Sequence, residues 1–176
     1  MLLYLSISIS ESGRYNCLLY FISSMRTVRK ATSSDKETLV KLFISEVEDN
    51  KDLAEAFAAD LLRFQTILSL DDGKILGTVS WDVRGGLDDG VVELIGLGVN
   101  PDYRRKGVAR ELVQTLIHDA SKHYSEHDHK LRVIYLFMEK SNEAGRAFYE
   151  SIGFKEVADV PDLYPHDDAT IWNIHL

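Results

Sequence analysis

A cluster of basic and small residues stands where an apolar segment gives way to an amphipathic one, in the run 99–110, VNPDYRRKGVAR. The small residues, Gly107 and Ala109, let a bound group come close to the main chain. The first turn of a helix leaves N–H groups without intrahelical partners and carries partial positive charge, which suits phosphate. Arginine adds bidentate contacts to phosphate. The run therefore predicts a phosphate-binding turn whose basic members are Arg104, Arg105, Lys106 and Arg110.

The spacing within this run is neither that of a Walker loop nor the GxGxxG of a dinucleotide site. As Arg104-x-x-Gly107-x-Ala109, it resembles the acyl-CoA signature Arg/Gln-x-x-Gly-x-Gly/Ala of the GNAT (Gcn5-related) N-acetyltransferase superfamily. Taken alone, the pattern also fits an ordinary solvated helix start.

A second block, residues 142–154, NEAGRAFYESIGF, resembles a later motif of the same family, Asn-x-x-Ala-x-x-Leu/Phe-Tyr-x-x-x-Gly-Phe. One departure is Gly145, which stands where the family usually has alanine and costs the helix roughly 0.5 to 1 kcal/mol. The two blocks occur in the family's order, and together they are far more specific than either alone.

The resemblance covers roughly residues 26–175 and implies an α/β (α+β) fold. Its mixed, mostly antiparallel sheet has about six to seven strands and about four flanking helices, and two central strands splay apart around acetyl-CoA. It also implies that the cofactor is bound by Leu97, Gly98, Val99, Arg104, Arg105, Lys106, Gly107, Val108, Ala109, Arg110, Asn142 and Tyr149.

The segment 91–99, VVELIGLGV, is predicted to be a strand with two unusual glycines, Gly96 and Gly98. Glycine weakens a strand and often marks a bulge or the close approach of another backbone. The resemblance implies that the pantetheine arm of acetyl-CoA pairs with Leu97 and Val99. Close packing against a neighbouring helix is the alternative.

Glu93 lies in the same strand, where a charged side chain is costly unless it is paired or reaches solvent. By the resemblance it takes the position of the glutamate that deprotonates the amine in a subset of these enzymes. A primary amine has a pKa of about 10 and arrives mostly as ammonium. We therefore predict that Glu93 is a general base, acting directly or through water, with a structural salt bridge as the alternative.

Tyr149 is the predicted general acid, because a phenol near the sulfur can protonate or hydrogen-bond the departing CoA thiolate. A core aromatic role is the alternative. Asn142 is expected to cap its helix and to contact the pantetheine arm. No covalent intermediate is expected, because no Ser-His-Asp set is evident and Cys17 lies outside the domain that the resemblance covers.

The composition fits one compact domain: 176 residues, 45% hydrophobic and 27% charged. The net charge of −8 disfavours nucleic acid as a partner and favours a cationic substrate. The acidic clusters around 46–52, 88–89 and 159–168 are either solvated loops or a means of steering an ammonium group. A homodimer is left open by the resemblance.

Four histidines crowd the segment 118–129 without the His-Glu-x-x-His order of a zinc site. We therefore expect no metal there, and a solvated helix end instead. The single cysteine, Cys17, excludes an internal disulfide and agrees with a cytoplasmic location.

Residues 1–24 differ from the rest, with two apolar runs too short to span a membrane as helices and no clear signal-peptide pattern. We expect an N-terminal extension over 1–24, either a gene-model artefact or an added edge element, and an N-acetyltransferase domain over 25–176. Met25 is then the expected initiator.

Hydrophobic periodicity and turn residues place helices at about 34–47, 51–64, 108–120 and 142–152. A capping box is expected at Ser34 and Glu37. Strands are expected at 27–31, 65–70, 74–83, 91–99, 131–137, 154–160 and 170–176.

The predicted reaction is acetyl transfer from acetyl-CoA to a primary amine by direct attack in a ternary complex. The leading candidate for the acceptor is a small cationic amine, such as a polyamine or an amino-acid derivative. The alternatives are a protein N-terminal or lysine acetyltransferase and a non-catalytic acyl-CoA-binding module. Trp81, Tyr164 and Trp172 are candidates for the acceptor groove or for the core.

Overall fold

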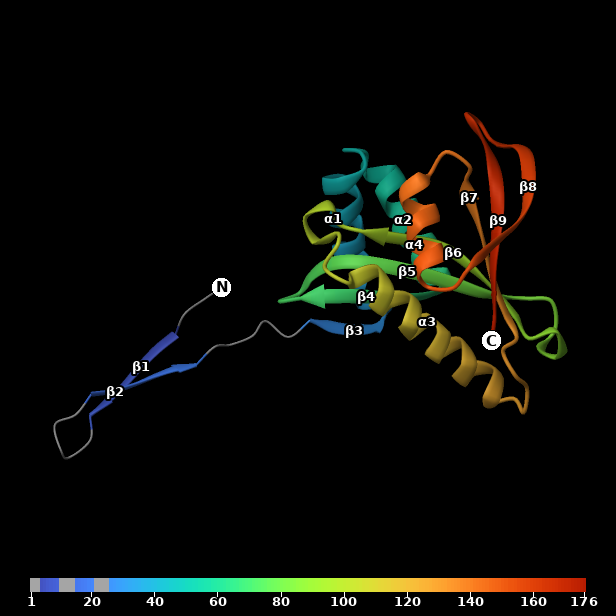
Figure 1. Cartoon of the computed structure of the whole chain (residues 1–176). Coiled ribbons are helices and arrows are strands. Elements are labelled where there is room, and N and C mark those ends of the chain that lie inside the picture. The colour runs from blue at the N-terminus through green and yellow to red at the C-terminus, as the bar shows by residue number, and fades with distance from the viewer. Residues whose placement is uncertain (1–3, 10–14, 21–25) are drawn as a thin grey trace.

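The computed structural model describes residues 4–9, 15–20 and 26–176 (Figure 1). The strands are β1 (Tyr4–Ile9), β2 (Tyr15–Tyr20), β3 (Thr27–Lys30), β4 (Gln65–Asp71), β5 (Lys74–Arg84), β6 (Val91–Val99), β7 (Val133–Glu139), β8 (Lys155–Tyr164) and β9 (Asp167–His175). The α-helices are α1 (Lys36–Glu46), α2 (Lys51–Arg63), α3 (Val108–Ser125) and α4 (Glu143–Ser151). Short 3-10 helices span Ser33–Asp35, Leu87–Asp89 and Pro101–Tyr103.

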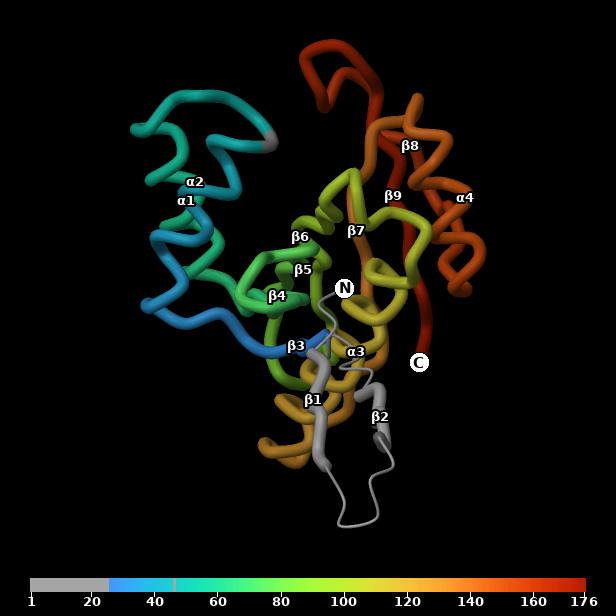
Figure 2. The backbone as a smooth tube through the Cα atoms, turned by 90° about the vertical axis from the view of Figure 1, so that its left-hand side faces the viewer, coloured from blue at the N-terminus to red at the C-terminus, as the bar shows by residue number. Residues whose placement is uncertain are grey.

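Seven strands form one mixed sheet in the order β3-β4-β5-β6-β7-β9-β8. Only the β6–β7 pair is parallel, and the other neighbours are antiparallel. The helices form layers on both faces, with α1 and α2 on one side and α3 and α4 on the other (Figure 2). The predicted fold class is confirmed.

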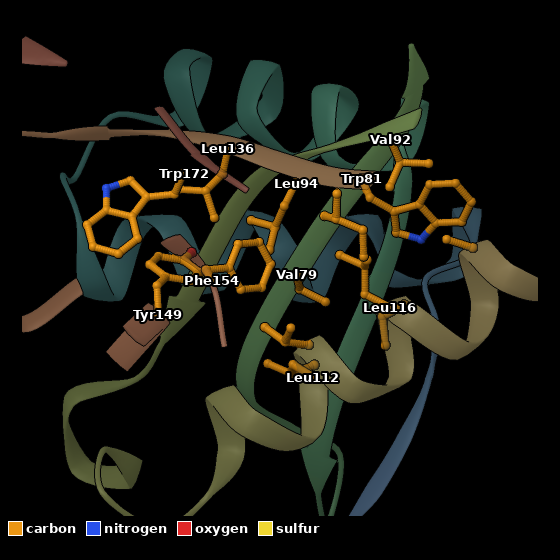
Figure 3. Close-up of a cluster of buried hydrophobic side chains, with 14 of the residues drawn as sticks. Val79, Trp81, Val92, Leu94, Leu112, Leu116, Leu136, Tyr149, Phe154 and Trp172 are labelled. Carbon is orange, nitrogen blue, oxygen red and sulfur yellow. The ribbon is translucent and has the colours of Figure 1, made fainter. Parts of the chain in front are cut away.

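The core has two parts that follow these layers. The larger part packs α3 and α4 against the sheet, and ten of its side chains are labelled in Figure 3. In α3, Leu112, Leu116 and Ala120 are fully buried, as the apolar stripe in the sequence predicts. A smaller cluster beneath α1 and α2 contains Leu39, Ala58, Leu68, Leu70 and Ile75.

The last hairpin is longer than predicted. The strand expected at 154–160 runs to Tyr164, and its partner begins at Asp167, so the turn is shorter than the sequence suggested. β8 is exposed along most of its length, so its sequence needs no apolar pattern. Pairing with β9 keeps its last residues in the strand.

The predicted capping box at Ser34 and Glu37 is wrong. The chain instead enters α1 through the 3-10 turn, where the carboxylate of Asp35 accepts hydrogen bonds from the N–H (2.8 Å) and the hydroxyl (3.0 Å) of Thr32. Arg29 donates two more hydrogen bonds, of 2.8 and 2.7 Å, to the same carboxylate. Asp35 is thus buried and paired, which stabilises this helix start.

Strands β1 and β2 pair antiparallel with each other and not with the seven-stranded sheet. Cys17 lies in β2. The division of the chain at 24/25 stays a prediction. Within the described part of the chain, no helix is long and apolar enough to cross a bilayer.

Replacing Asp35 by asparagine (Asp35→Asn) should destabilise the fold by about 1–3 kcal/mol, because it breaks the charged hydrogen bonds to Arg29. The hydrogen bond from Arg29, followed by those from Thr32, lowers the pKa of Asp35 well below its usual range. A carboxyl with a lowered folded-state pKa stabilises the protein above its unfolded pKa, and this contribution fades as the pH falls through the folded value.

Urea unfolding of the wild type and the variant at pH 7 and at about pH 2–3 measures this effect. The difference between the two proteins should shrink at the lower pH. Asp49→Asn, at an exposed aspartate, is the matched control. An equal difference at both pH values would contradict the assignment.

Candidate active site

The central feature is the divergence of β6 and β7. They pair only at Val91–Val133, Val92–Ile134 and Glu93–Tyr135, yet β6 continues to Val99 and β7 to Glu139. A cavity of about 310 Å³ occupies the resulting gap. It is lined by residues 94–97 of β6, residues 137–139 of β7, Asn142, Gly145 and Tyr149 near and within α4, and Tyr164 at the end of β8.

The main chain of β6 faces this gap at two predicted positions. The N–H of Asn100 donates to the carbonyl of Leu76 (2.9 Å), so Asn100 points toward β5. Main-chain groups of successive residues in a strand point to opposite edges, and Val99 and Leu97 therefore point away from β5. Since β7 does not pair here, the N–H and C=O of Leu97 and the N–H of Val99 are available to a peptide-like ligand, while the carbonyl of Val99 accepts a hydrogen bond from Arg104 (3.3 Å).

A β-bulge separates the paired and unpaired parts of β6. Ser80 lies opposite Gly96 and Trp81 opposite Leu94, which leaves Ile95 as the extra residue. The bulge predicted from the two glycines is thus present. A bulge twists its strand, which helps β6 turn away from β7.

The phosphate-binding turn lies between the 3-10 helix Pro101–Tyr103 and α3. Gly107, with φ +82°, immediately precedes α3, and Arg105 is also left-handed, with φ +60°. A non-glycine residue in this region carries strain, which is typical of functional turns. The turn is anchored by Arg26, which donates to the carbonyl of Lys106 (3.2 Å) and pairs with Glu111 (2.7 Å).

The basic side chains of the turn are all exposed, and three of them contact protein groups. Arg104 donates to the carbonyl of Val99 (3.3 Å), and Arg110 contacts the main chain and hydroxyl of Ser151 (3.4 and 3.3 Å). Lys106 lies 4.9 Å from the centre of the Tyr103 ring. The turn therefore gathers positive charge at one end of the gap, while Val108 is buried in the core.

Tyr149 combines both predicted roles. Its ring packs against Phe154 (centroids 5.4 Å apart) in the core, and its side chain lines the gap (Figure 3). Burial raises the pKa of its hydroxyl, and no charged or hydrogen-bonding neighbour contributes to the shift. The hydroxyl therefore stays protonated at neutral pH and is available to a ligand in the gap.

Asn142 caps α4, as predicted, by accepting a hydrogen bond from the N–H of Gly145 (2.9 Å). The departure at Gly145 has a steric reason. A Cβ at this position would lie 2.5 Å from Sδ of Met138 and 2.8 Å from Nδ2 of Asn142. Glycine at this site therefore preserves both the cap and the buried methionine.

Glu93 stands where the paired part of β6 ends. Its Oε2 accepts hydrogen bonds from Nε of Arg84 (2.7 Å) and from the hydroxyl of Tyr135 (3.2 Å). Arg84 also pairs with Asp82 (2.8 Å). The hydrogen bonds to Glu93 and then Asp82 raise the pKa of the Arg84 guanidinium, which stays charged. The salt bridge considered as an alternative is present, and the general-base role of Glu93 stays a prediction.

Sequence reasoning missed Arg84, Tyr135 and Glu139. Glu139 lines the gap together with Tyr164. Burial, followed by the charges of Glu139 and Glu93, raises the pKa of Tyr164. The alternation of β5 and β6 could have placed Arg84 on the face of Glu93, but β7 comes forty residues later and gave no such signal. Trp81 and Trp172 lie in the core, so Tyr164 alone of the three aromatic candidates lines the gap.

The histidine-rich segment spans the end of α3 and the turn that follows it. His127 Nδ1 lies 2.8 Å from the carbonyl of His123, and His129 contacts Asp88 (3.3 Å). In the part of the chain that the structure describes, no group of three or more metal-ligating side chains occurs.

The family model described as acetyltransferase (GNAT) family matches residues 33–154. Ribosomal protein bS18-alanine N-acetyltransferase of Escherichia coli (strain K12) is 35% identical over 76 residues, 43% of this chain and 47% of that protein. Mycothiol acetyltransferase of Corynebacterium diphtheriae is 32% identical over 115 residues, 62% of this chain and 35% of that protein. The matched region thus spans about half the length of the bS18-alanine N-acetyltransferase and about a third of the length of the mycothiol acetyltransferase.

Solved structures agree with this fold. The ribosomal-protein-S18-alanine N-acetyltransferase from Escherichia coli superposes with a TM-score of 0.68 at 24% identity, covering 86% of this chain and 94% of that chain. Ard1 from Thermoplasma volcanium gives a TM-score of 0.69 at 18% identity, covering 86% and 97%. Because the family model matches well over half of this chain, the chain belongs to the acetyltransferase (GNAT) family.

Proposed function

We propose that this enzyme transfers the acetyl group of acetyl-CoA to a primary amine by direct attack within a ternary complex. The observation that carries the proposal is the gap between β6 and β7. Leu97, whose main chain is not paired with β7, and the buried Tyr149 both line this gap. A thioester placed there lies between a strand edge that holds it and a phenol that can reach its sulfur.

Three groups of residues would hold the donor. The turn 104–107 and the first N–H groups of α3 would bind the diphosphate, and Leu97 and Val99 would pair with the pantetheine amides. Asn142, whose Oδ1 is used by the cap, keeps its amide nitrogen for the pantetheine arm. Bound in this way, acetyl-CoA supplies an activated acyl carbon next to Tyr149.

Glu93 is the proposed base. Its carboxylate is fixed through Oε2 by Arg84 and Tyr135 at the closed end of the gap. A base here can take a proton from the ammonium form of the acceptor, directly or through water, and so expose the nucleophilic lone pair.

Tyr149 is the proposed partner of the leaving sulfur. A thiol has a pKa of about 8.5, whereas burial raises the pKa of Tyr149 above that of an ordinary phenol. Complete transfer of the phenolic proton is therefore uphill, and a hydrogen bond that stabilises the developing thiolate is the favoured contribution.

The charges around the gap favour a small cationic acceptor, such as a polyamine or an amino-acid derivative. Glu139 lines the gap, and its charge and that of Glu93 both contribute to the raised pKa of Tyr164. Arg84 is shared between the carboxylates of Asp82 and Glu93. A protein N-terminus or lysine is the second candidate, which the likeness to the bS18-alanine N-acetyltransferase favours.

Release of CoA thiol, measured with acetyl-CoA over a panel of amines and peptides, tests the proposal. Polyamines, amino-acid amides, peptides with a free N-terminus and N-terminally blocked lysine peptides should differ in kcat/KM, with the small amines best. Tight binding of acetyl-CoA with no thiol release from any acceptor would instead indicate a non-catalytic acyl-CoA-binding module.

Glu93→Gln should lower turnover by about 10²–10⁴-fold, because the amide cannot accept the ammonium proton. The acidic limb of the pH–rate profile should change in the variant. Glu150→Gln removes the same charge from an exposed position on α4 and is the control. A profile identical to that of the wild type would leave Glu93 as a purely structural partner of Arg84.

Gly107→Ala should weaken acetyl-CoA binding by about tenfold, because it strains the turn and adds a methyl group where the diphosphate is expected. Gly73→Ala is a matched control. Both glycines have positive φ (+82° and +76°) and neither would bring a Cβ within 4 Å of a neighbouring atom. Both variants should lose about 1 kcal/mol of stability. Calorimetric titration with acetyl-CoA should show weaker binding for Gly107→Ala than for Gly73→Ala. Equal affinities of the two variants would count against this turn as the phosphate site.

A further inference from the structure

A second cavity, of about 590 Å³, lies on the other face of β6, between the sheet and the α1–α2 pair. Its lining shares Leu97, Gly98, Val99 and Arg104 with the expected donor site, whereas its α1–α2 side has no part in that site. Its roof is mostly apolar, and half of the apolar side chains are aromatic: Leu42, Phe43, Val47, Phe57, Leu61 and Phe64. The charged lining residues are Asp60, which pairs with Arg63 (3.6 Å), and Arg104. A cavity of this size and lining suits a small apolar group.

The floor of this cavity is made of small residues. Gly96 and Gly98 lie opposite Ser80 and Thr78 in the register of β5 and β6. A Cβ at Gly96 would meet no atom within 4 Å, and one at Gly98 would meet only Oγ1 of Thr78, at 3.7 Å. Close helix packing therefore does not account for Gly96, and the two glycines keep the cavity open.

The cavity adjoins the reaction gap at the bulge. Ile95, Gly96 and Leu97 line both spaces. The α1–α2 layer lies on the face opposite α3, at whose start the donor diphosphate is expected (Figure 2). A group in this cavity therefore approaches the thioester from the side away from α3.

We infer that this cavity binds the apolar body of the acceptor, so that the preferred substrate is a primary amine carried on an aromatic or branched aliphatic group. The inference rests on the proposed acetyl transfer and narrows its acceptor. Of the acceptors considered above, a polyamine fits this cavity less well, because its second ammonium group would lie among aromatic side chains, and the carboxylate in the lining, Asp60, already pairs with Arg63 (3.6 Å). An aralkylamine instead leaves its single charge at the carboxylate end of the gap.

The test compares 2-phenylethylamine with ethylamine, which differ by the ring, through their kcat/KM with acetyl-CoA. The wild type should prefer phenylethylamine by about tenfold or more. Phe57→Ser, which removes an apolar roof side chain, should reduce this ratio severalfold. Leu53→Ser is the control, because Leu53 is an exposed leucine about one turn earlier in α2 and does not line the cavity.

Gly96→Val is a second variant, which fills the cavity without a clash at Cβ. It should reduce the same ratio even if Phe57→Ser folds poorly. A further assay moves the aromatic ring to the acyl donor, with phenylacetyl-CoA as donor and ethylamine as acceptor. If wild type uses that donor well and Gly96→Val abolishes this use instead, the cavity serves the acyl group and the inference is wrong.

Equal efficiency with both amines in the wild type would overturn this inference while leaving acetyl transfer to amines intact. Absence of thiol release with every amine would overturn the proposed function and this inference with it.

Discussion

Everything in the site depends on how few hydrogen-bonded positions join β6 to β7. Three residue pairs hold the two strands together, and beyond Glu93 and Tyr135 each strand follows a different neighbour. β6 stays with β5, and β7 stays with β9, over their remaining lengths. Unpaired main chain inside a protein is costly, so such a gap persists only where a ligand or solvent can satisfy it.

The same divergence concentrates ionisable groups. Glu93 and Tyr135 mark the last paired position, and Arg84 reaches Glu93 from the neighbouring strand. The three form a fixed polar group at the closed end, while the basic turn lies at the other end of β6. The closed end of the gap thus holds the paired Glu93 and Arg84, whereas the exposed side chains of Arg104, Arg105 and Lys106 lie beyond the other end of β6.

Sequence patterns predicted most elements because their signals are local. The hydrophobic periodicity of α3 and the break between the strands expected at 65–70 and 74–83 each lie within one short window. The start of α1 was misplaced because Thr32 with Asp35 competes with Ser34 and Glu37, and only the contact with Arg29 decides between them.

The site was predictable only in part. Two motifs pointed to the turn and to α4, since each is contiguous in sequence. The salt bridge between Glu93 and Arg84 and the contact with Tyr135 depend on strand order and register, which no single window contains. The cavity beneath α1 and α2 depends on the absence of side chains at Gly96 and Gly98, and it could be identified only once the position of the facing helices was known.

Arg26 links two segments that are distant along the chain. It directly precedes the edge strand β3 and binds both the Lys106 carbonyl and the Glu111 carboxylate. Fraying of that edge strand would release a brace on the turn, so local unfolding at one margin of the sheet is mechanically coupled to the amides at the start of α3. Opening of β3 should therefore also lower the hydrogen-exchange protection of the amides at the start of α3.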